Sequence, residues 1–251
     1  WPILAAAPPV KTPALLEPTT MALPEPAPVE AAPVPSVVRP PDALLTACKT
    51  VIYVGDSTSL ALTSREYLPE LEDQLAARHQ AVGVEHFTPE ISGARSIVEK
   101  YNDKPSAWEV VHKKRGSGYD GCWVFALGTN DPANVKGNLP GLAQRIGWMM
   151  VQAEGRPVLW STTKTLLGSG PYKNAHMESW TTALVQACER YPNMRVYDWA
   201  SEVQDSWYLP DGIHPNPTGA RERAVRLAKA IARAFPRDGA PSPGCLVRST
   251  P

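Results

Sequence analysis

Two short segments, far apart in the chain, carry residues that can serve as a nucleophile and as its base. In the first, Ser57 follows a β-branched run and the pair Gly55-Asp56, so it lies where a strand turns into a helix. The backbone amides and the dipole at a helix N-terminus favour negative charge that develops beside a serine hydroxyl. Because Asp and Ser also commonly cap helices, this segment alone has a purely structural alternative.

The second segment is Asp211-Gly212-Ile213-His214, which precedes the last helical stretch of the chain. A carboxylate three residues before an imidazole can accept one ring N–H and leave the other ring nitrogen free to act as a base. Taken alone, such a pair is more often a surface turn, and it is sometimes half of a metal site. No pair of His or Cys residues at metal-ligand spacing accompanies it, so we predict a base and no metal site.

A serine nucleophile also needs hydrogen-bond donors that stabilise the oxyanion of the tetrahedral intermediate. Asn130, in the segment Gly128-Thr129-Asn130-Asp131, follows an apolar run and can point its side-chain amide into a site. Gly93 follows another such run, and a glycine lets its backbone N–H approach a ligand closely. Each loop alone has an interpretation as a plain turn. The four loops together favour a site, because the carboxyl ends of parallel strands meet at one edge of a sheet.

The elements that must position these loops are visible as β-branched runs that alternate with longer amphipathic stretches. This alternation is typical of βαβ units and a parallel sheet. We expect strands over residues 51–54, 82–87, 123–127, 157–160 and 194–197. We expect helices over residues 69–79, 106–114, 139–153, 174–190 and 218–235. The predicted fold is therefore one three-layer α/β domain around a five-stranded parallel sheet.

The last expected helix is strongly amphipathic. Its apolar residues recur at helical spacing at Val225, Ala228, Ile231, Ala232 and Phe235. Its basic residues are Arg221, Arg223, Arg226, Lys229 and Arg233. We interpret these basic residues as a solvated face of the helix.

Composition divides the chain into a stalk, a domain and a tail. Residues 1–42 contain 12 of the 27 prolines and many alanines, which is typical of a semi-rigid extended linker. A proline-rich ligand is the alternative, but the prolines follow no repeated PxxP pattern with basic flanks. We expect the domain over residues 43–236 and a C-terminal tail over 237–251. The 25 basic and 25 acidic residues leave no net charge, which argues against nucleic acid as a partner.

The four loop segments resemble, in the same order, the sequence blocks of the SGNH hydrolases, also called GDSL-type esterases and lipases. The resemblance spans about residues 50–235. It implies that Ser57 is the nucleophile, that His214 is the general base and that Asp211 orients His214. It implies an oxyanion hole formed by the Ser57 N–H, the Gly93 N–H and the Asn130 side chain. It also implies a flavodoxin-like sheet of strand order 2-1-3-4-5 and no cofactor.

The resemblance further implies acyl transfer through a serine ester, to water or to a sugar hydroxyl. SGNH domains occur as extracytoplasmic parts of bacterial membrane acyltransferases that modify envelope glycans, and a Pro/Ala stalk before the domain is similar to that arrangement. We therefore expect O-acyl transfer, chiefly of acetyl, to or from cell-envelope glycan. The implied partners are an acyl donor, a glycan acceptor and an upstream membrane portion of the same polypeptide. The alternatives are a secreted carbohydrate esterase or lipase-like hydrolase and a non-catalytic glycan-binding module.

Three residues near the strand-end loops are candidates for substrate binding. Trp207 and Tyr208 lie shortly before Asp211, and their rings can stack on a sugar. Arg95, in the loop that contains Gly93, is the third candidate. Trp160 also lies at the end of an expected strand, but we expect it to pack in the core.

The four cysteines predict two disulfides. Cys48 and Cys122 precede the first and third expected strands, which are neighbours in a 2-1-3-4-5 sheet, about 4.8 Å apart. We predict the disulfide Cys48–Cys122 and, by elimination, Cys188–Cys245, with four buried thiols as the alternative. Disulfides and the stalk favour a periplasmic or cell-surface location, tethered to a membrane in the full-length protein. The printed sequence itself contains no run of 18 apolar residues that could span a bilayer.

Overall fold

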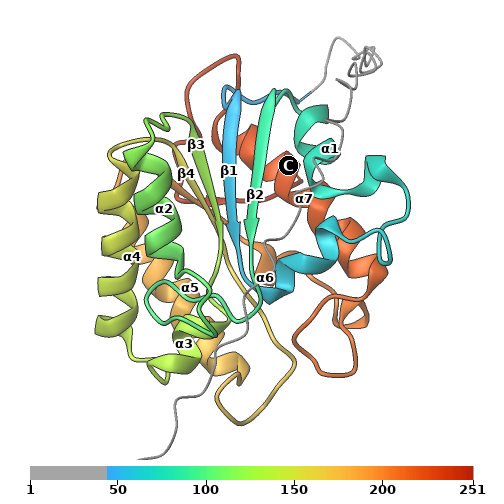
Figure 1. Ribbon diagram of the computed structural model, residues 1–251, viewed down its shortest axis with the longest axis vertical. Helices are drawn as coiled ribbons and strands as arrows, with labels where there is room; N and C mark the ends of the chain where they lie inside the picture. The colour runs from blue at the N-terminus through green and yellow to red at the C-terminus, as the bar shows by residue number, and fades with distance from the viewer. Residues whose placement is uncertain (1–43, 251) are drawn as a thin grey trace, which may run out of the picture. The chain divides into compact units, whose positions relative to one another are not determined.

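Six parallel strands form one sheet in the order β2-β1-β3-β4-β5-β6 (Figure 1). The structure, a computed structural model, describes residues 44–250, so the predicted stalk over residues 1–42 lies outside the described residues. The strands are β1 (Thr50–Gly55), β2 (His86–Ile91), β3 (Cys122–Ala126), β4 (Val158–Ser161), β5 (Met194–Tyr197) and β6 (Leu246–Val247). The central strands β3 and β4 are buried along their whole length, as expected for a parallel sheet covered on both faces.

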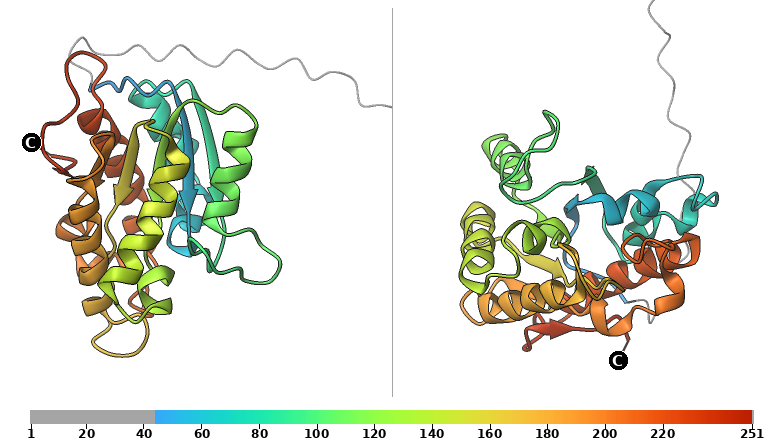
Figure 2. Two further views of the ribbon diagram at one scale, coloured as in Figure 1. Left: turned by 90° about the vertical axis from the view of Figure 1, so that its left-hand side faces the viewer. Right: turned by 90° about the horizontal axis from the view of Figure 1, so that it is seen from below.

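Helices cover both faces of this sheet (Figure 1, Figure 2). The α-helices are α1 (Leu75–Ala81), α2 (Ala107–Gly116), α3 (Asn130–Asn134), α4 (Leu139–Ala153), α5 (Asn174–Cys188), α6 (Trp199–Glu202) and α7 (Pro217–Ala234). The 3₁₀ helices are η1 (Ser57–Thr63), η2 (Leu71–Asp73) and η3 (Asp205–Trp207). Helices α1 and α7 pack on one face, and α2, α4 and α5 pack on the other. The three-layer α/β architecture predicted from the sequence is therefore confirmed.

Alternate residues of β1 point to opposite sides and so enter two separate hydrophobic cores. Val51 and Tyr53 lie in the core beneath α7, whereas Ile52 and Val54 lie in the core beneath α2 and α4. Trp160 is fully buried in the second core, as expected from the sequence. The two cores fix β1 from both faces, so the loop that leaves its carboxyl end starts from a rigid support.

The second strand and the first helix lie later in the chain than predicted. Residues 82–87 were expected to form a strand, but β2 spans His86–Ile91. Val82 and Val84 are buried in the turn after α1, where they pack into the core instead of pairing in the sheet. Strand β2 is an edge strand with exposed positions and a proline, so it lacks the apolar pattern of a buried strand. The expected helix over residues 69–79 is divided into η2 and the short α1.

The predicted C-terminal tail contributes a sixth strand. Leu246 and Val247 pair in parallel with Val196 and Tyr197 of β5, so the sheet has six strands and not five. The adjacent disulfide Cys188–Cys245 joins the end of α5 to the start of β6 and holds the tail in this place. The folded unit therefore extends beyond residue 236, where the domain was expected to end.

Both predicted disulfides are present. The Cα atoms are 5.7 Å apart in Cys48–Cys122 and 5.8 Å apart in Cys188–Cys245. Each disulfide joins residues near the amino ends of strands, at the edge of the sheet opposite to the loops that carry Ser57 and Asn130. Within residues 44–250, no helix is both long and apolar enough to span a membrane.

Candidate active site

The nucleophile candidate lies directly after the central strand β1. Ser57 is the first residue of η1, and Asp56 caps this helix: its Oδ1 accepts hydrogen bonds from the Thr58 N–H (3.0 Å) and hydroxyl (2.7 Å). A side chain at Gly55 would clash, because a Cβ there would lie 2.7 Å from the Ser59 oxygen. Ser57 thus begins a seven-residue 3₁₀ helix, and the buried Asp56 caps its first turn.

Ser57, His214 and Asp211 form a continuous hydrogen-bonded chain. Ser57 Oγ lies 2.9 Å from His214 Nε2, and His214 Nδ1 lies 2.7 Å from Asp211 Oδ2. Partial burial alone would raise the pKa of Asp211, but the hydrogen bonds from His214 and Ile213 outweigh it and hold that pKa below its usual value. An ionised carboxylate only accepts, so Nδ1–H donates to Asp211, and Nε2 is left to accept the Ser57 hydroxyl hydrogen.

The loop that presents His214 is closed by its own short-range hydrogen bonds. Asp211 Oδ1 accepts from the backbone N–H groups of Ile213 (2.8 Å) and His214 (2.9 Å). The Leu209 N–H donates to the His214 carbonyl at 2.8 Å, which closes the loop at its base. Gly212 has φ +67°, a conformation that a residue with a side chain rarely adopts. Asp211 therefore positions His214 through both the backbone and the ring.

The three predicted oxyanion donors leave neighbouring strands at the same level of the sheet. Gly55 at the end of β1 pairs with Ile91 of β2 and with Ala126 of β3. Ser57 and Gly93 follow their strands by two residues each, and Asn130 follows Ala126 by four. Among residues 44–250, no acceptor takes the backbone N–H of Ser57 or of Gly93, so both are free for a ligand.

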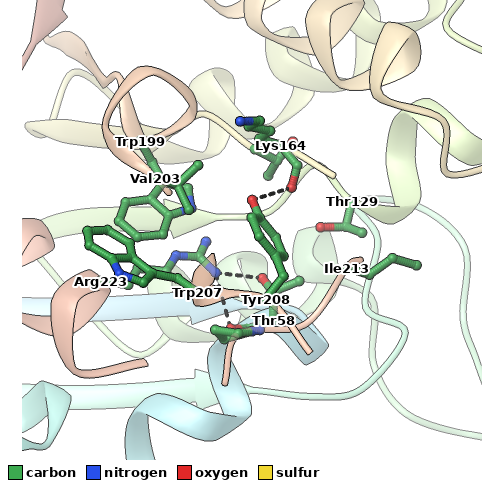
Figure 3. Close-up of a pocket in the computed structure, with 11 residues that line it drawn as sticks. Thr58, Thr129, Lys164, Trp199, Val203, Trp207, Tyr208, Ile213 and Arg223 are labelled. Carbon is green, nitrogen blue, oxygen red and sulfur yellow. Dashed lines mark hydrogen bonds between the residues drawn. The ribbon is translucent and has the colours of Figure 1, made fainter. Parts of the chain in front are cut away.

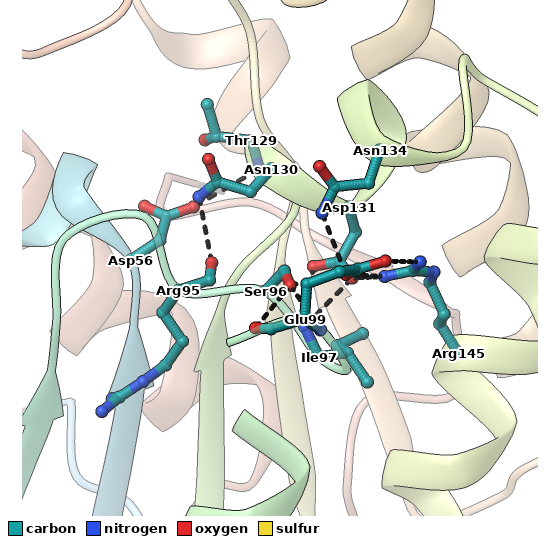
Figure 4. Close-up of polar contacts among 10 residues, drawn as sticks. All are labelled: Asp56, Arg95, Ser96, Ile97, Glu99, Thr129, Asn130, Asp131, Asn134 and Arg145. Carbon is teal, nitrogen blue, oxygen red and sulfur yellow. Dashed lines mark hydrogen bonds and ion pairs between the residues drawn. The ribbon is translucent and has the colours of Figure 1, made fainter. Parts of the chain in front are cut away.

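Asn130 is held in place by one of its own amide hydrogens. Its side chain is buried, and Nδ2 donates to the Arg95 carbonyl at 3.0 Å (Figure 4). The remaining Nδ2 hydrogen has no acceptor within the described part of the chain. The turn before Asn130 depends on Gly128, which has φ +118° and where a Cβ would lie 2.0 Å from the Trp180 indole nitrogen. The loop can therefore pass Trp180 only with glycine at this position.

Two of the predicted substrate-binding residues, Trp207 and Tyr208, differ in their burial and contacts. Trp207 is 7% exposed, with its ring 5.9 Å from that of Trp199 and with Arg226 above it at 5.3 Å, so it cannot stack on a sugar and that prediction is wrong. Tyr208 is partly buried, and its hydroxyl donates to the Lys164 carbonyl at 2.8 Å (Figure 3). Both rings line a cavity of only about 20 Å³, which is the size of a water molecule. A sugar-stacking role stays a prediction for Tyr208 alone.

The Arg95 side chain also does not reach the site. It is 6% exposed, and its guanidinium donates to the Glu90 carbonyl, whereas its own backbone carbonyl binds Asn130. Figure 4 shows the Arg95 side chain directed away from Asn130 and Asp56. Arg95 therefore contributes through its main chain, and the prediction that its side chain binds substrate is wrong.

The interpretation of Arg223 as part of a solvated face is also wrong. Arg223 is 3% exposed and donates to the carbonyl (3.1 Å) and hydroxyl (2.8 Å) of Thr58, the residue after the nucleophile (Figure 3). Its guanidinium lies 5.7 Å from the ring centroid of Trp199. Ala220, one turn before it on α7, is also fully buried. The signal in the sequence is that Arg223 shares helical spacing with buried Ala220 and Leu227.

Sequence reasoning also assigned no role to a partly buried ion cluster that includes Asp131, the residue after Asn130. Asp131, Arg145 and Glu99 come from α3, α4 and the loop after β2, and they are joined by two ion pairs (Figure 4). Asp131 is fully buried and Arg145 is 8% exposed. The signal for this cluster is that Arg145 lies among the apolar residues Leu142 and Ile146 of α4.

The arrangement as a whole can carry out nucleophilic chemistry at a carbonyl group. A hydroxyl, an imidazole and a carboxylate are linked in the order that transfers one proton away from the hydroxyl. Free N–H groups on the adjacent loops can stabilise an oxyanion. Among residues 44–250, no group of three or more His, Cys, Asp or Glu residues is placed to hold a metal ion.

Comparison with known proteins identifies the fold. No protein-family model matches the sequence, and no curated protein does so either. The structure is similar to a lipase/acylhydrolase from Enterococcus faecalis (TM-score 0.58, 15% identity), with 76% of this chain and 100% of that chain covered. It is similar to Est24, a carbohydrate acetylesterase from Sinorhizobium meliloti (TM-score 0.55, 16% identity; 74% and 100% covered).

A third similar structure is a Slackia heliotrinireducens protein assigned to the SGNH hydrolases (TM-score 0.53, 18% identity; 72% and 98% covered). The resemblance inferred from the four sequence blocks is thus confirmed at the level of the fold, although the identities are low. The match extends over the whole length or nearly the whole length of each of these chains. This chain therefore has the SGNH-hydrolase fold.

Proposed function

We propose that this protein is a serine-dependent ester hydrolase or O-acyltransferase with Ser57 as nucleophile, His214 as general base and Asp211 as its orienting carboxylate. The observation that carries the proposal is the unbroken contact from Ser57 Oγ through both His214 nitrogens to Asp211. The unpaired N–H groups of Ser57 and Gly93 beside it support the same chemistry.

The proposed reaction has two steps, acylation of Ser57 by the ester and then transfer of the acyl group from Ser57 to an acceptor. His214 Nε2 accepts the Ser57 proton as Oγ bonds to the ester carbonyl carbon, and the carbonyl electrons move to oxygen. The Ser57 N–H, the Gly93 N–H and the free Asn130 amide hydrogen stabilise this oxyanion. Collapse of the intermediate breaks the bond to the alcohol, which leaves with the proton from His214. The acyl group then passes by the same steps from Ser57 to water or to a second hydroxyl.

We infer further that the acyl group is acetyl and that the acceptor or substrate is a glycan of the cell envelope. The fold similarity to a carbohydrate acetylesterase supports this choice. The two disulfides indicate an oxidising compartment and so support an extracytoplasmic location. The Pro/Ala-rich composition of residues 1–42 supports a stalk that connects the domain to an upstream membrane acyltransferase portion.

Turnover of a chromogenic acetyl ester by the wild-type protein and by Ser57→Ala tests the catalytic role. We expect Ser57→Ala to lose more than about 10³-fold in kcat, because no other group replaces the nucleophile. Ser169→Ala, at an exposed loop serine, is the matched control and should retain full activity. Equal rates for the wild-type protein and Ser57→Ala would remove the enzyme proposal and favour a glycan-binding module.

A second experiment separates transfer from hydrolysis. The protein is supplied with the acetyl ester and a panel of envelope oligosaccharides, and both alcohol release and acetylated sugar are measured. Transfer predicts that one oligosaccharide accelerates alcohol release and becomes acetylated. Alcohol release without any acetylated sugar would support a hydrolase.

A further inference from the structure

The loop that carries Gly93 is hydrogen-bonded to α3 through three of its residues, Arg95, Ile97 and Glu99. This segment, residues 92–99, is called the oxyanion loop below. Its three contacts with α3 are the Arg95 carbonyl with Asn130 Nδ2 (3.0 Å), the Ile97 N–H with both Asp131 oxygens (3.0 and 3.2 Å), and Glu99 Oε2 with Asn134 Nδ2 (2.9 Å). The loop and the start of α3 each carry one proposed oxyanion donor, so these contacts set the spacing between the donors.

The guanidinium of Arg145, on α4, links the oxyanion loop to α3. Arg145 of α4 donates from Nη1 to Asp131 Oδ1 at 2.7 Å and to Glu99 Oε2 at 2.6 Å, and from Nη2 to Glu99 Oε1 (Figure 4). Its planar fork thus holds a carboxylate of α3 and a carboxylate of the oxyanion loop at the same time. Arg145 is 8% exposed and Asp131 is fully buried, so their ion pair is shielded from solvent, whereas the carboxylate of Glu99 lies at the surface.

The two carboxylates need this cation. Glu99 has its pKa lowered to about 2, chiefly by the hydrogen bond from Arg145, whereas burial raises the pKa of Asp131 to about 6. Both groups are therefore ionised at neutral pH. Ser96 and Asn134 also face Glu99, and the Ile97 N–H faces Asp131, but Arg145 is the only cation bound to this pair among the described residues. Without it, two adjacent negative charges would repel each other across the contact between loop and helix.

We propose that Arg145 is a positioning residue that keeps the oxyanion loop against α3, so that the Gly93 N–H and the Asn130 amide stay directed at one point. The inference rests on the proposed function, since it assigns these donors to an oxyanion. Arg145 itself contacts neither Ser57 nor His214 and acts through Asp131 and Glu99. It also offsets one of two negative charges close to the place where the oxyanion forms.

The variant Arg145→Gln tests this role. Oxyanion donors act mainly in the transition state, so misplacing them lowers kcat and leaves KM nearly unchanged. We expect kcat to fall about 10- to 100-fold, since small displacements of catalytic groups have effects of this size. Arg145→Lys keeps the charge but loses the fork, and it should recover part of the activity. Glu99→Gln breaks one side of the arrangement and should lower kcat less, by about 3- to 10-fold.

Rates are expressed per active site, counted by complete reaction of Ser57 with a fluorophosphonate, so that unfolded protein does not contribute. Arg115→Gln is the control, because it makes the same substitution at an arginine that pairs with Glu154 at the surface and has no bond to the oxyanion loop. It should match the wild-type kcat. Glu99 is 44% exposed in its side chain, so Glu99→Gln provides a testable variant even where Arg145→Gln does not fold.

The outcomes separate this inference from the proposed function. A kcat per active site within twofold of the wild-type value for Arg145→Gln, or for Glu99→Gln where only that variant folds, would overturn it. A rise in KM without loss of kcat would do the same, because it would indicate a substrate contact. If instead the wild-type protein is no faster than Ser57→Ala, the proposed function itself fails.

Discussion

The two sides of the candidate site are held in contrasting ways. On the acid–base side, Asp211 and His214 lie on a loop closed by contacts between residues two to five positions apart, and their side chains are 45% and 36% exposed. On the oxyanion side, the loop is held by buried charges from two other elements, Asp131 and Arg145. The base thus depends mainly on local geometry, with one backbone hydrogen bond from the Leu166 N–H to the Gly212 carbonyl (2.8 Å) that ties its loop to a distant segment. The oxyanion hole depends on buried charges from distant segments.

This difference has consequences for mutation. A change on the acid–base side should remove chemistry with little effect on the fold, because the side chains of Asp211 and His214 are partly exposed and the backbone hydrogen bond from Leu166 to their loop does not involve them. A change on the oxyanion side should affect both the rate and the stability, because breaking a buried ion pair leaves an uncompensated charge.

His214→Ala should have the largest effect. It removes the only group placed to accept the Ser57 proton in the described structure, so kcat should fall by about 10⁴-fold or more. The melting temperature should change by less than about 2 °C, since the ring is partly exposed and lies on a self-closed loop. Steady-state kinetics and thermal unfolding on the same preparation provide the measurement. A large loss of stability would show that the acid–base side is not independent of the core.

Asn130→Ala should have the next largest effect. Removing one oxyanion donor typically costs about 10²- to 10³-fold in kcat. The variant also breaks the contact with the Arg95 carbonyl, so a modest loss of stability should accompany the kinetic defect. Kinetics with the acetyl ester and urea unfolding measure the two effects. A fall in kcat or kcat/KM of less than threefold would indicate that Asn130 serves only to hold the loop.

The disulfides provide a third region for comparison, at the opposite edge of the sheet. Their loops span 74 and 57 residues, so removing either one should cost about 2–5 kcal/mol of unfolding free energy. The kcat of the folded enzyme should not change, because neither disulfide contacts the site. The paired variants Cys48→Ser/Cys122→Ser and Cys188→Ser/Cys245→Ser are measured by urea unfolding and kinetics. A tenfold drop in kcat would contradict this prediction and would show that the edge of the sheet with the disulfides affects the catalytic edge.

Glu99→Gln should have a small effect on stability, and that effect should depend on pH. The folded-state pKa of Glu99, about 2, lies below its usual value of 4.5, so its contribution to stability is fully present above about pH 4.5. That contribution is lost as the pH falls toward 2. The melting temperature of the wild type should therefore exceed that of Glu99→Gln at pH 7, and the two should converge at low pH. Glu66→Gln, at an exposed carboxylate, is the control. A difference that persists to pH 2 would contradict the ion-pair explanation.

The acid–base side could be predicted from the sequence because its decisive contacts are short-range. Asp211 and His214 are three residues apart, and the turn between them follows from Gly212. Elements with strong apolar periodicity were also predicted accurately, such as the helix Leu139–Ala153. The disulfide Cys48–Cys122 followed from strand adjacency in a parallel sheet, and Cys188–Cys245 followed by elimination.

The oxyanion side could not be predicted to the same depth, because its contacts join distant segments. Arg145 is 14 residues from Asp131 and 46 from Glu99. An arginine on an amphipathic helix is usually solvated. Its sequence neighbours do not reveal that the side chain will be buried and paired with two carboxylates. Arg223 was misassigned for the same reason. Strand β6 was missed because two residues carry no detectable alternation.

In the proposed reaction, His214 activates Ser57, and Ser57 becomes acylated. The most direct measurement is peptide mass spectrometry after reaction with a fluorophosphonate, on the wild-type protein and on His214→Ala. We predict one stoichiometric adduct on Ser57 in the wild-type protein, and labelling of His214→Ala that is slower by orders of magnitude. Absence of label on Ser57, or equally fast labelling of both proteins, would contradict the account.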